Sequence, residues 1–440
     1  MLKTRRVRNL SVKTKKSPTI QARKAIIPSS VKSKSTKFDF GNRVLSEILG
    51  GEKQVPSVSK YEFVKEIGEG AQGAVFLGHQ LSEFGIKKRI AIKVIKDEYG
   101  EKEIKKIVRE AKLLELLTQG SIVEMLALES LPVSRKSNKK VYLLIEELID
   151  GQSLEKLMML HKRKNLLMNP ALIGFTLYRA ALALDEAHNL KNRKGEKLNL
   201  VHRSLSPSNI LYNDNGGIVK LSDFGMATMD DSSLSADKLK GKPQYMAPEQ
   251  FQAKNKPCSD IWALGVIGYE ALTGFVPYQI KGKTLSEATS MFVEQSHYTL
   301  RSPAEILATS KSHYQLNKLS EIIMNCLNIN GHKRPSADDL QHSLASEFLY
   351  SSGLGPTNKT MAAYLNLVKE MPVQDDFVVS DIKMSESVTN TLNRTLHIKK
   401  PISAICARVS KSFKNEFLIS IKAKHKNPCL KPDNGRVYGA

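Results

Sequence analysis

A glycine-rich turn is the first segment whose residue types could serve chemistry. Gly68, Gly70 and Gly73 have the spacing GxGxxG and follow the strand-like run YEFVKEIGEG. Such turns occur in nucleotide-binding loops, in dinucleotide-binding folds and in ordinary hairpins. Here the next residues, AVFLGHQ, alternate as a second strand, whereas a dinucleotide-binding fold would begin a helix. The turn by itself therefore leaves a nucleotide site and a plain hairpin both open.

A single charged residue stands inside the next strand-like segment. Lys93 lies in the run RIAIKVI at 89–95, with apolar residues on both sides. Because burying an unpaired ammonium group is costly, this lysine is expected to have an acidic partner. Glu110 is the candidate, since it borders the apolar face of an amphipathic helix expected at 101–117. The alternative is that Glu110 is a surface residue of a charged helix.

Two later segments carry a family resemblance. LVHRSLSPSNIL at 200–211 and VKLSDFGMA at 219–227 resemble the catalytic loop and the DFG segment of eukaryotic-type serine/threonine protein kinases. The other motifs similar to that family are, in order, the glycine turn, Lys93, Glu110, the triplet Ala247-Pro248-Glu249, the segment DIWALG at 260–265 and KRPSADDL with Arg334. The resemblance covers residues 60–348, and its strength lies in the order of many motifs.

The resemblance implies an α+β, two-lobed protein-kinase fold with a small β-rich N-lobe and a helical C-lobe. Three regions are expected: a basic disordered N-terminal arm at 1–59, a kinase-like domain at 60–348, and a largely unstructured basic extension at 349–440. A last short helix is expected near 354–368, and FLISIK at Phe417–Lys422 looks strand-like.

The resemblance also implies ATP and Mg²⁺ as cofactors. Lys93 would hold the phosphates and Glu110 would hold Lys93, while Asn209 and Asp223 would be the metal ligands. Backbone groups of Glu146 and Leu148 would meet the adenine edge. The side chains and loop residues expected around the nucleotide are Ile67, Gly68, Gly70, Gly73, Val75, Ala91, Lys93, Ile145 at the back, Glu146, Leu148 and Leu211. His202 and Phe224 are expected to pack, and Glu249 and Arg334 to form a structural ion pair.

One departure from the family concerns the catalytic base. An active kinase has the triplet HRD, whose aspartate accepts or orients the proton of the substrate hydroxyl. This chain has His202-Arg203-Ser204, and a serine hydroxyl has no accessible anionic form at neutral pH. The next acid in the loop is Asp214, which lies beyond Asn209. The sequence therefore predicts a vacant base position at Ser204.

A second departure has a compensation in the sequence. The lysine usual two residues after the base is Ser206, but Lys242 precedes the APE segment in GKPQYMAPEQ. This combination resembles a bacterial branch of these kinases, and it implies that Lys242 serves the γ-phosphate from the other side. Ser206 alone is therefore weak evidence for inactivity.

Three functions remain open on these residues. The first is a nucleotide-binding pseudokinase that acts in signalling as a scaffold or allosteric partner of a protein. The second is a slow serine/threonine kinase with a protein substrate, because positioning and charge neutralisation supply most of the catalysis of phosphoryl transfer. The third is a protein that binds nucleic acid or an anionic membrane surface through its basic tails.

The amino-acid composition limits the class of protein and its cellular compartment. The 440 residues carry a net charge of +23, and residues 1–37 hold twelve Lys or Arg and no acid, which predicts a disordered arm. Four cysteines without a CxxC pair indicate a reducing, cytoplasmic location. No apolar run reaches the ~18 residues of a membrane helix, so no transmembrane segment is expected.

Overall fold

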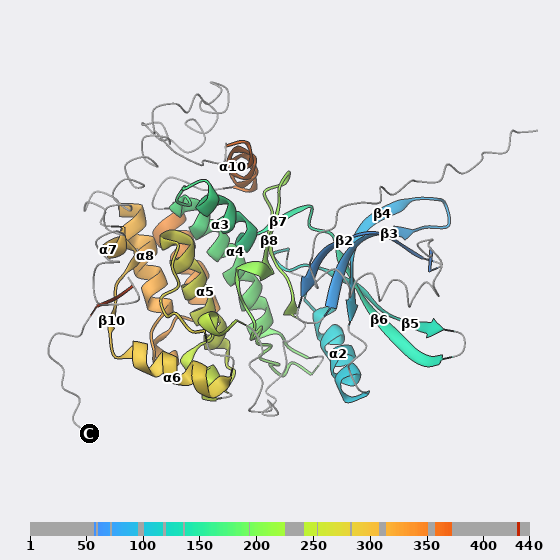
Figure 1. Cartoon of the computed structure of the whole chain (residues 1–440), viewed down its shortest axis with the longest axis horizontal. Coiled ribbons are helices and arrows are strands. Elements are labelled where there is room, and N and C mark those ends of the chain that lie inside the picture. Colours follow the sequence, from blue (N-terminus) through green and yellow to red (C-terminus); the bar gives the residue numbers. More distant parts are fainter. Residues whose placement is uncertain are drawn as a thin grey trace, which may run out of the picture.

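A computed structural model of the chain describes residues 57–58, 60–70, 73–95, 101–117, 120–134, 137–192, 194–224, 242–252, 254–281, 284–307, 314–350, 357–371 and 429–431. The basic run 1–37 and the strand-like segment Phe417–Lys422 lie outside these residues. The described part forms a smaller β-rich lobe and a larger helical lobe (Figure 1). This confirms the predicted α+β, two-lobed architecture.

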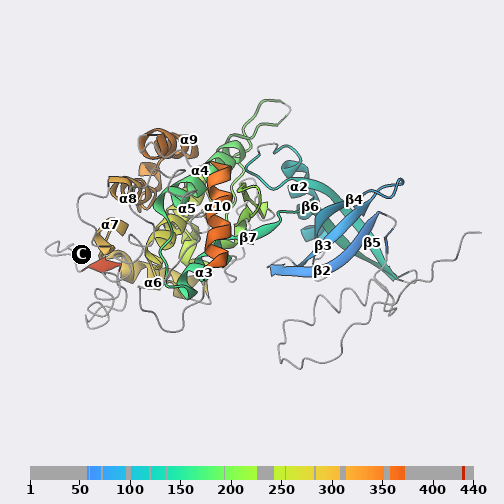
Figure 2. The same cartoon turned by 90° about the horizontal axis from the view of Figure 1, so that it is seen from above.

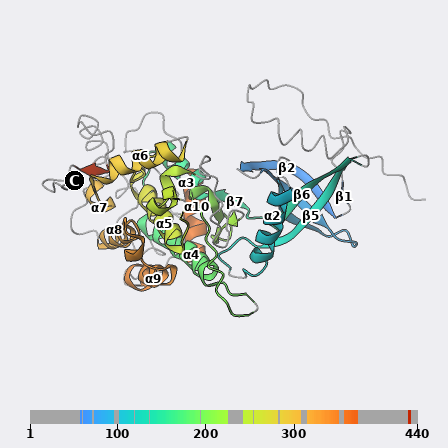
Figure 3. The same ribbon diagram turned by 90° about the horizontal axis from the view of Figure 1, so that it is seen from below.

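The smaller lobe contains a six-stranded antiparallel sheet with the order β1-β2-β3-β4-β6-β5. Its strands are β1 (Ser57–Val58), β2 (Tyr61–Gly70), β3 (Gly73–Leu81), β4 (Lys87–Ile95), β5 (Met125–Ser134) and β6 (Ser137–Glu147). Helix α2 (Glu101–Leu114) lies alongside this sheet (Figures 1 and 3).

Alternation along β4 decides which of its side chains enter the core of the smaller lobe. Ile90, Ile92 and Val94 are each 0% exposed and belong to one apolar cluster. The residues between them, Ala91 and Lys93, project from the opposite face, because successive side chains of a strand alternate. The same strand therefore builds a core with one face and presents a lysine with the other.

The larger lobe is mainly helical and also contains short strands. Its helices are α3 (Leu154–Arg163), α4 (Pro170–Asn189), α5 (Pro257–Thr273), α6 (Leu285–Ser296), α7 (Pro303–Ile306), α8 (Tyr314–Cys326), α9 (Ala337–His342) and α10 (Asn358–Glu370), with a π-helical segment at Ser343–Tyr350. Strands β7 (Gly151–Ser153), β8 (Ile210–Asn213) and β9 (Val219–Leu221) form a small antiparallel sheet, and β10 (Thr299–Leu300) pairs with β11 (Leu430–Lys431). Single 3-10 turns occur at Pro207–Asn209, Pro243–Tyr245, Pro248–Gln252 and Gly331–Lys333.

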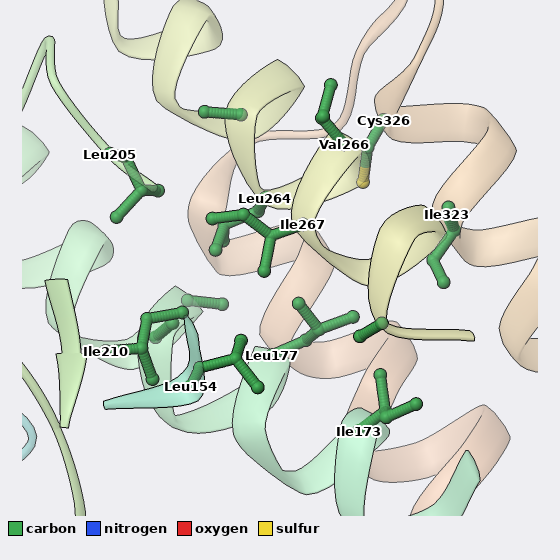
Figure 4. Close-up of a cluster of buried hydrophobic side chains, with 14 of the residues drawn as sticks. Leu154, Ile173, Leu177, Leu205, Ile210, Leu264, Val266, Ile267, Ile323 and Cys326 are labelled. Carbon is green, nitrogen blue, oxygen red and sulfur yellow. The ribbon is translucent and has the colours of Figure 1, made fainter. Parts of the chain in front are cut away.

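Helices α4 and α5 form the centre of the larger lobe. Helix α5 is apolar around most of its circumference, as is typical of a buried helix, and begins with Pro257 at its first position. Its C-cap is Gly274, whose φ of +78° suits a glycine. Figure 4 shows Leu177 from α4, Ile267 from α5 and Ile323 from α8 in one buried cluster. Among the described residues, no helix is long and apolar enough to cross a membrane.

Helix α10 lies where the sequence predicted a last short helix. Its first residue follows the N-cap Thr357, and it packs across α3 (Figure 2). Met361, Leu365 and Val368 are at most 1% exposed and belong to the core of the larger lobe. The core therefore continues past residue 348, and the domain boundary set at that residue remains a prediction.

A buried lysine holds the C-terminal end of α10. Lys164 is 2% exposed and donates from Nζ to the carbonyl oxygen of Val368 at 2.6 Å and to that of Met371. Cations at a helix C-terminus satisfy free carbonyls and interact favourably with the helix dipole. Tyr364 adds a 2.5 Å hydrogen bond to Nε2 of His161. Burial lowers the pKa of His161 to about 4, so this contact is made by the neutral ring at pH 7.

Replacing Leu365 with alanine should lower the free energy of unfolding by about 2–5 kcal/mol, the usual cost of truncating a fully buried leucine. Chemical denaturation of the full chain measures this change. Lys359→Ala on the exposed side of α10 is the control and should change stability by no more than about 0.5 kcal/mol. An unchanged unfolding midpoint for Leu365→Ala would show that α10 is not part of the core.

Candidate active site

The glycine-rich turn joins β2 to β3 as a hairpin, as the sequence predicted. Gly70 lies opposite Gly73, and Gly68 lies opposite Val75. Gly73 has a φ of +156°, and a Cβ atom there would lie 1.7 Å from the carbonyl oxygen of Val94. A side chain would therefore have to push β3 away from β4, so the close backbone approach requires glycine at this position.

Val75, Ala91 and Lys93 share one face of the sheet. Val75 lies directly opposite Lys93 in the β3–β4 ladder, and directly opposite residues of an antiparallel pair project from the same face. Ile67 lies at an irregularity of β2 before Gly68 and is 38% exposed. The predicted nucleotide-facing residues of β3 and β4 are thus on the face opposite the apolar core.

Lys93 forms an ion pair with Asp223, which joins the smaller lobe to the larger one. Burial by itself raises the pKa of Asp223, but the charge of Lys93 and its hydrogen bond outweigh burial, so the pKa of this carboxyl is lowered. Asp223 also has a φ of +68°, a conformation uncommon outside glycine. Such conformations persist where the surrounding structure holds them, and they are frequent at functional sites.

The two predicted metal ligands lie next to each other. Nδ2 of Asn209 is 3.4 Å from Oδ2 of Asp223, and Oδ1 of Asn209 accepts a 2.9 Å hydrogen bond from the hydroxyl of Ser206. One carboxylate and one amide oxygen fit Mg²⁺ that completes its shell with phosphates and waters. In the described ranges, no group of three or more His, Cys, Asp or Glu side chains could hold a metal ion by itself.

The expected contact between Lys93 and Glu110 remains a prediction. Glu110 belongs to α2, but its side chain lies outside the described part of the structure.

Asp260 anchors the catalytic loop. Its carboxylate accepts hydrogen bonds from the backbone N–H groups of His202 at 2.8 Å and Arg203 at 3.0 Å, and it contacts Nε2 of His188 at 2.9 Å. Arg203 has a φ of +67°, so this anchor holds the loop in an uncommon backbone conformation. The sequence singled out the segment DIWALG but did not predict this role, although a lone acid at the start of an apolar helix was a signal for it.

The packing roles predicted for two aromatic residues of the site are confirmed. His202 is 0% exposed, packs against Phe224 in a tilted arrangement with ring centres 4.6 Å apart, and contacts the carbonyl oxygen of Ser222 through Nε2 at 3.0 Å. Through these contacts with Ser222 and Phe224, the His202 ring connects the catalytic loop to the segment that carries Asp223.

Ser204 occupies the loop position of the expected base. It lines a cavity of about 10 Å³, room for a single water molecule, together with Lys242 and Asp260. Asp260 is not available as a base, because it is 1% exposed and already holds the loop backbone. Asp214 is paired with Lys369 on α10, away from this position.

Lys242 lies beside the catalytic loop. Its Nζ is 3.5 Å from Oγ of Ser208 and forms an ion pair with Glu155 in the first turn of α3. The Ser208 hydroxyl lies 2.8 Å from that of Ser206, which in turn donates to Asn209. A chain of hydroxyl contacts thus connects Lys242 to a predicted metal ligand. No motif or spacing in the sequence pointed to Glu155 as the partner of this lysine.

The sequence prediction for Ile145 is wrong. Ile145 lies opposite Ile92 in the β4–β6 ladder, is 0% exposed and packs in the core of the smaller lobe. Glu146 lies opposite Ala91, so its side chain shares the face of Ala91 and Lys93. The apolar run around Ile145 shows no alternation of apolar and polar residues, so the sequence cannot tell which side chains face the core. A shift of one residue in the register of the strand would move every side chain to the opposite face of the sheet.

Two other predicted pocket positions lie near the junction of the lobes. Leu211 on β8 stands between Ile210 and Tyr212, which are 0% exposed in the core, and therefore projects from the other face of the small sheet. Leu148 follows β6 and is partly buried. That the backbone groups of Leu148 and Glu146 bind adenine remains a prediction.

The predicted ion pair between Glu249 and Arg334 is confirmed. Nη1 and Nη2 of Arg334 donate to the two carboxylate oxygens of Glu249 at 2.7 and 3.0 Å. The side chain of Arg334 is 0% exposed and also donates to the carbonyl oxygen of Asn328 at 2.7 Å. Its guanidinium lies 4.9 Å from the centre of the Trp262 ring. This cluster supports the larger lobe and has no catalytic group.

A β-rich lobe, a helical lobe, a lysine–aspartate pair between them and a loop carrying Asn209 together define the architecture of a protein kinase. The family described as Protein kinase domain matches residues 61–345, more than half of the chain. The chain therefore belongs to the protein kinase domain family. Domains of this family in general use ATP and Mg²⁺.

Individual relatives come from different kingdoms. The chain is 27% identical over 345 residues to the Dual specificity mitogen-activated protein kinase kinase jkk-1 of Caenorhabditis elegans, covering 77% of this chain and 72% of jkk-1. It is 30% identical over 243 residues to Myosin light chain kinase A of Dictyostelium discoideum, covering 54% of this chain and 74% of that protein. It is 32% identical over 223 residues to the Tyrosine-protein kinase MasK of Myxococcus xanthus, covering 50% of this chain and 33% of MasK.

Proposed function

We propose that this protein binds ATP as a protein kinase-like protein, is impaired in phosphoryl transfer, and acts in signalling as a scaffold or an allosteric partner of another protein. The observation that carries the proposal is Ser204 at the position of the catalytic base. A neutral hydroxyl cannot accept the proton of a substrate hydroxyl as a carboxylate does. Asp260 and Asp214 cannot take this role, because each already has other partners.

The remaining groups support nucleotide binding. Lys93 would neutralise phosphate charge, and Asp223 and Asn209 would hold Mg²⁺. The metal, when bound, supplies charge neutralisation on the phosphates. Lys242, beside the catalytic loop, would reach the γ-phosphate in place of the lysine that Ser206 replaces.

A slow serine/threonine kinase is the second candidate, favoured by the position of Lys242. General acid–base help contributes about 10²–10⁴ in rate. Kinases turn over at roughly 1–100 s⁻¹, so a site that lacks only its base would retain about 10⁻⁴ to 1 s⁻¹. The Ser206-Pro207 and Gly241-Lys242 pairs, and the similarity to MasK, support a bacterial branch of the family.

Binding of nucleic acid or an anionic membrane surface by the basic tails is a third proposal. It rests on the twelve Lys and Arg residues in 1–37. A gel shift that weakens steeply with salt would support it, and no binding at low salt would refute it.

A cytoplasmic location is part of the overall proposal and rests on the small number of cysteines, three of which, in the described ranges, are free.

Millimolar Mg·ATP is expected to raise the melting temperature of the full chain. A ligand that binds only the folded state stabilises it by mass action, by about 2.7 kcal/mol at 100 times its Kd. We expect a Kd between micromolar and millimolar. Differential scanning fluorimetry with and without EDTA measures the shift and its dependence on Mg²⁺.

Lys93→Ala and Asp223→Ala should each reduce this shift, because they remove the phosphate and metal contacts. Lys318→Ala, on the far helix α8, is the control and should leave it unchanged. The absence of any shift with millimolar Mg·ATP would refute nucleotide binding.

A further inference from the structure

The side chain of Glu146 places a carboxyl group on the face of the sheet that also carries Lys93. Glu146 lies directly opposite Ala91 in the β4–β6 ladder, and Leu144 lies opposite Lys93. These four residues therefore share one face of the sheet, since opposite residues project together and alternate residues share a face. The other face carries the apolar core with Ile145.

This carboxyl group has no partner in the described part of the chain. No hydrogen bond or ion pair joins it to any described residue, although Lys93 on the same face pairs with Asp223. Burial raises the pKa of Glu146 to about 7, with Lys93 opposing the shift and Asp223 adding to it. The side chain is partly buried, and its carboxyl group, without a described partner on the face of Lys93, is available to a ligand.

The next residue, Glu147, differs from Glu146 because its carboxylate has partners within the protein. Glu147 accepts a 2.8 Å hydrogen bond from the backbone N–H of Glu124 and forms an ion pair with Lys220. One oxygen of its carboxylate, Oε1, therefore has two partners within the protein. Of the two consecutive acids at the end of β6, Glu146 is the one that shares the face of Lys93 and whose carboxyl group has no partner among the described residues.

We propose that Glu146 is a specificity-determining residue of the nucleotide pocket, and that its side-chain carboxyl accepts a hydrogen bond from the exocyclic amino group of adenine. This inference rests on the proposed binding of ATP. A phosphate group is excluded as the partner of Glu146, because a carboxylate and a phosphate repel each other, whereas Lys93 on the same face offers a cation to phosphates. The base is the part of the nucleotide that offers a neutral donor to a carboxyl group in either protonation state.

Sites built to hydrogen-bond a substrate group discriminate strongly against analogues that lack it. The analogue here is purine riboside triphosphate, which is ATP without the amino group at position 6. The test measures the Kd of both Mg-nucleotides for the full chain by isothermal titration calorimetry. Wild-type protein is expected to bind ATP at least about tenfold more tightly than the analogue.

Variants of Glu146 separate the side chain from the backbone contacts. Glu146→Leu removes the acceptor, and the ratio of the two Kd values should fall at least about fivefold from the wild-type ratio. Glu146→Gln keeps a carbonyl acceptor and should hold the ratio within about twofold of wild type. Glu147→Gln, which alters the neighbouring and already paired acid, is the matched control and should keep the wild-type ratio.

The outcomes distinguish this inference from the proposed function. Equal binding of ATP and the analogue by wild-type protein overturns the role of Glu146 even if the leucine variant does not fold, while ATP binding itself stands. An unchanged ratio of the two Kd values in a folded Glu146→Leu variant also overturns the role of Glu146 and leaves ATP binding standing. Failure of the wild-type protein to bind either nucleotide refutes the proposed function, and the inference with it.

Discussion

Replacing Ser204 with aspartate is expected to raise the rate of phosphoryl transfer by about 10²–10⁴, because it would supply the general base that, on our proposal, the catalytic loop lacks. The loop is already held in place by Asp260, which binds two of its backbone N–H groups, and this anchor does not involve residue 204. The cavity beside Ser204 holds about one water and is lined partly by Lys242, so a carboxylate there would lie near a cation. Transfer of radioactive phosphate from Mg·ATP to a generic protein substrate measures the rate.

Two further variants show whether the gain comes from the base. Ser204→Asn has a side chain of nearly the same shape as aspartate and no basic oxygen, so it should remain at the wild-type rate. Ser204→Asp combined with Lys242→Ala should fall back towards background, because Ser206 leaves Lys242 as the lysine beside the loop. If Ser204→Asp stays silent while ATP still binds, more than the base has been lost, and a role as a switch or scaffold is favoured.

Replacing Arg334 with alanine should destabilise the protein by about 3–5 kcal/mol, the usual cost of breaking a buried ion pair by removing one partner. The guanidinium is 0% exposed and donates to both oxygens of Glu249. Its removal leaves a carboxylate in a largely buried position without its charge partner, and also frees the carbonyl oxygen of Asn328. Urea denaturation monitored through Trp262, which lies beside Arg334, measures the loss.

The pH dependence of stability gives this prediction a second readout. Burial by itself raises the pKa of Glu249, but hydrogen bonds from Arg334 and Ser259 outweigh it and lower the pKa in the folded state. A group with a lowered folded-state pKa contributes stability above its unfolded pKa, near 4.3, and loses that contribution as the pH falls through the folded value. The Arg334→Ala variant should therefore lose less stability than wild type on acidification.

The control for Arg334→Ala is an exposed ion pair on the same lobe. Lys318 contacts Glu347 at 2.7 Å, and the Glu347 side chain is 48% exposed. Lys318→Ala should cost no more than about 1 kcal/mol. Equal losses for the two variants would contradict the structural role assigned to Arg334.

The sequence predicted the elements whose residues carry strong local signals. The hairpin around Gly73, the strand with Lys93 and the buried helix after Pro257 follow from turn chemistry, β-branched runs and continuous apolar composition. The order of the kinase motifs then gave the two-lobed arrangement. These features are local or ordered along the chain, so a single sequence is enough to find them.

The errors and omissions concern contacts between distant segments. Ile145 and Glu146 could not be assigned to their faces, because the face depends on pairing with β4 and not on the strand itself. The role of Asp260 depends on a loop 57 residues earlier in the chain, and the partner of Lys242 is Glu155, 87 residues away. Such pairs leave no periodic trace in the sequence.

The packing of α10 against the larger lobe also could not be predicted from the sequence. A short helix near 354–368 could be predicted from its apolar residues, but not its place in the core. That place depends on Lys164, which is more than 200 residues away and lies in a segment that reads as exposed and basic. Lysines are rarely buried, and only the structure shows that the Lys164 ammonium group donates to three carbonyl oxygens.

The most direct test of the central claim is the rate of phosphate transfer by the wild-type protein at saturating Mg·ATP. The claim is that the nucleotide site is preserved while the base is missing. We therefore predict saturable ATP binding together with a turnover between zero and about 1 s⁻¹. Turnover at tens per second would contradict the claim, because it would require another group to act as the base in place of Ser204.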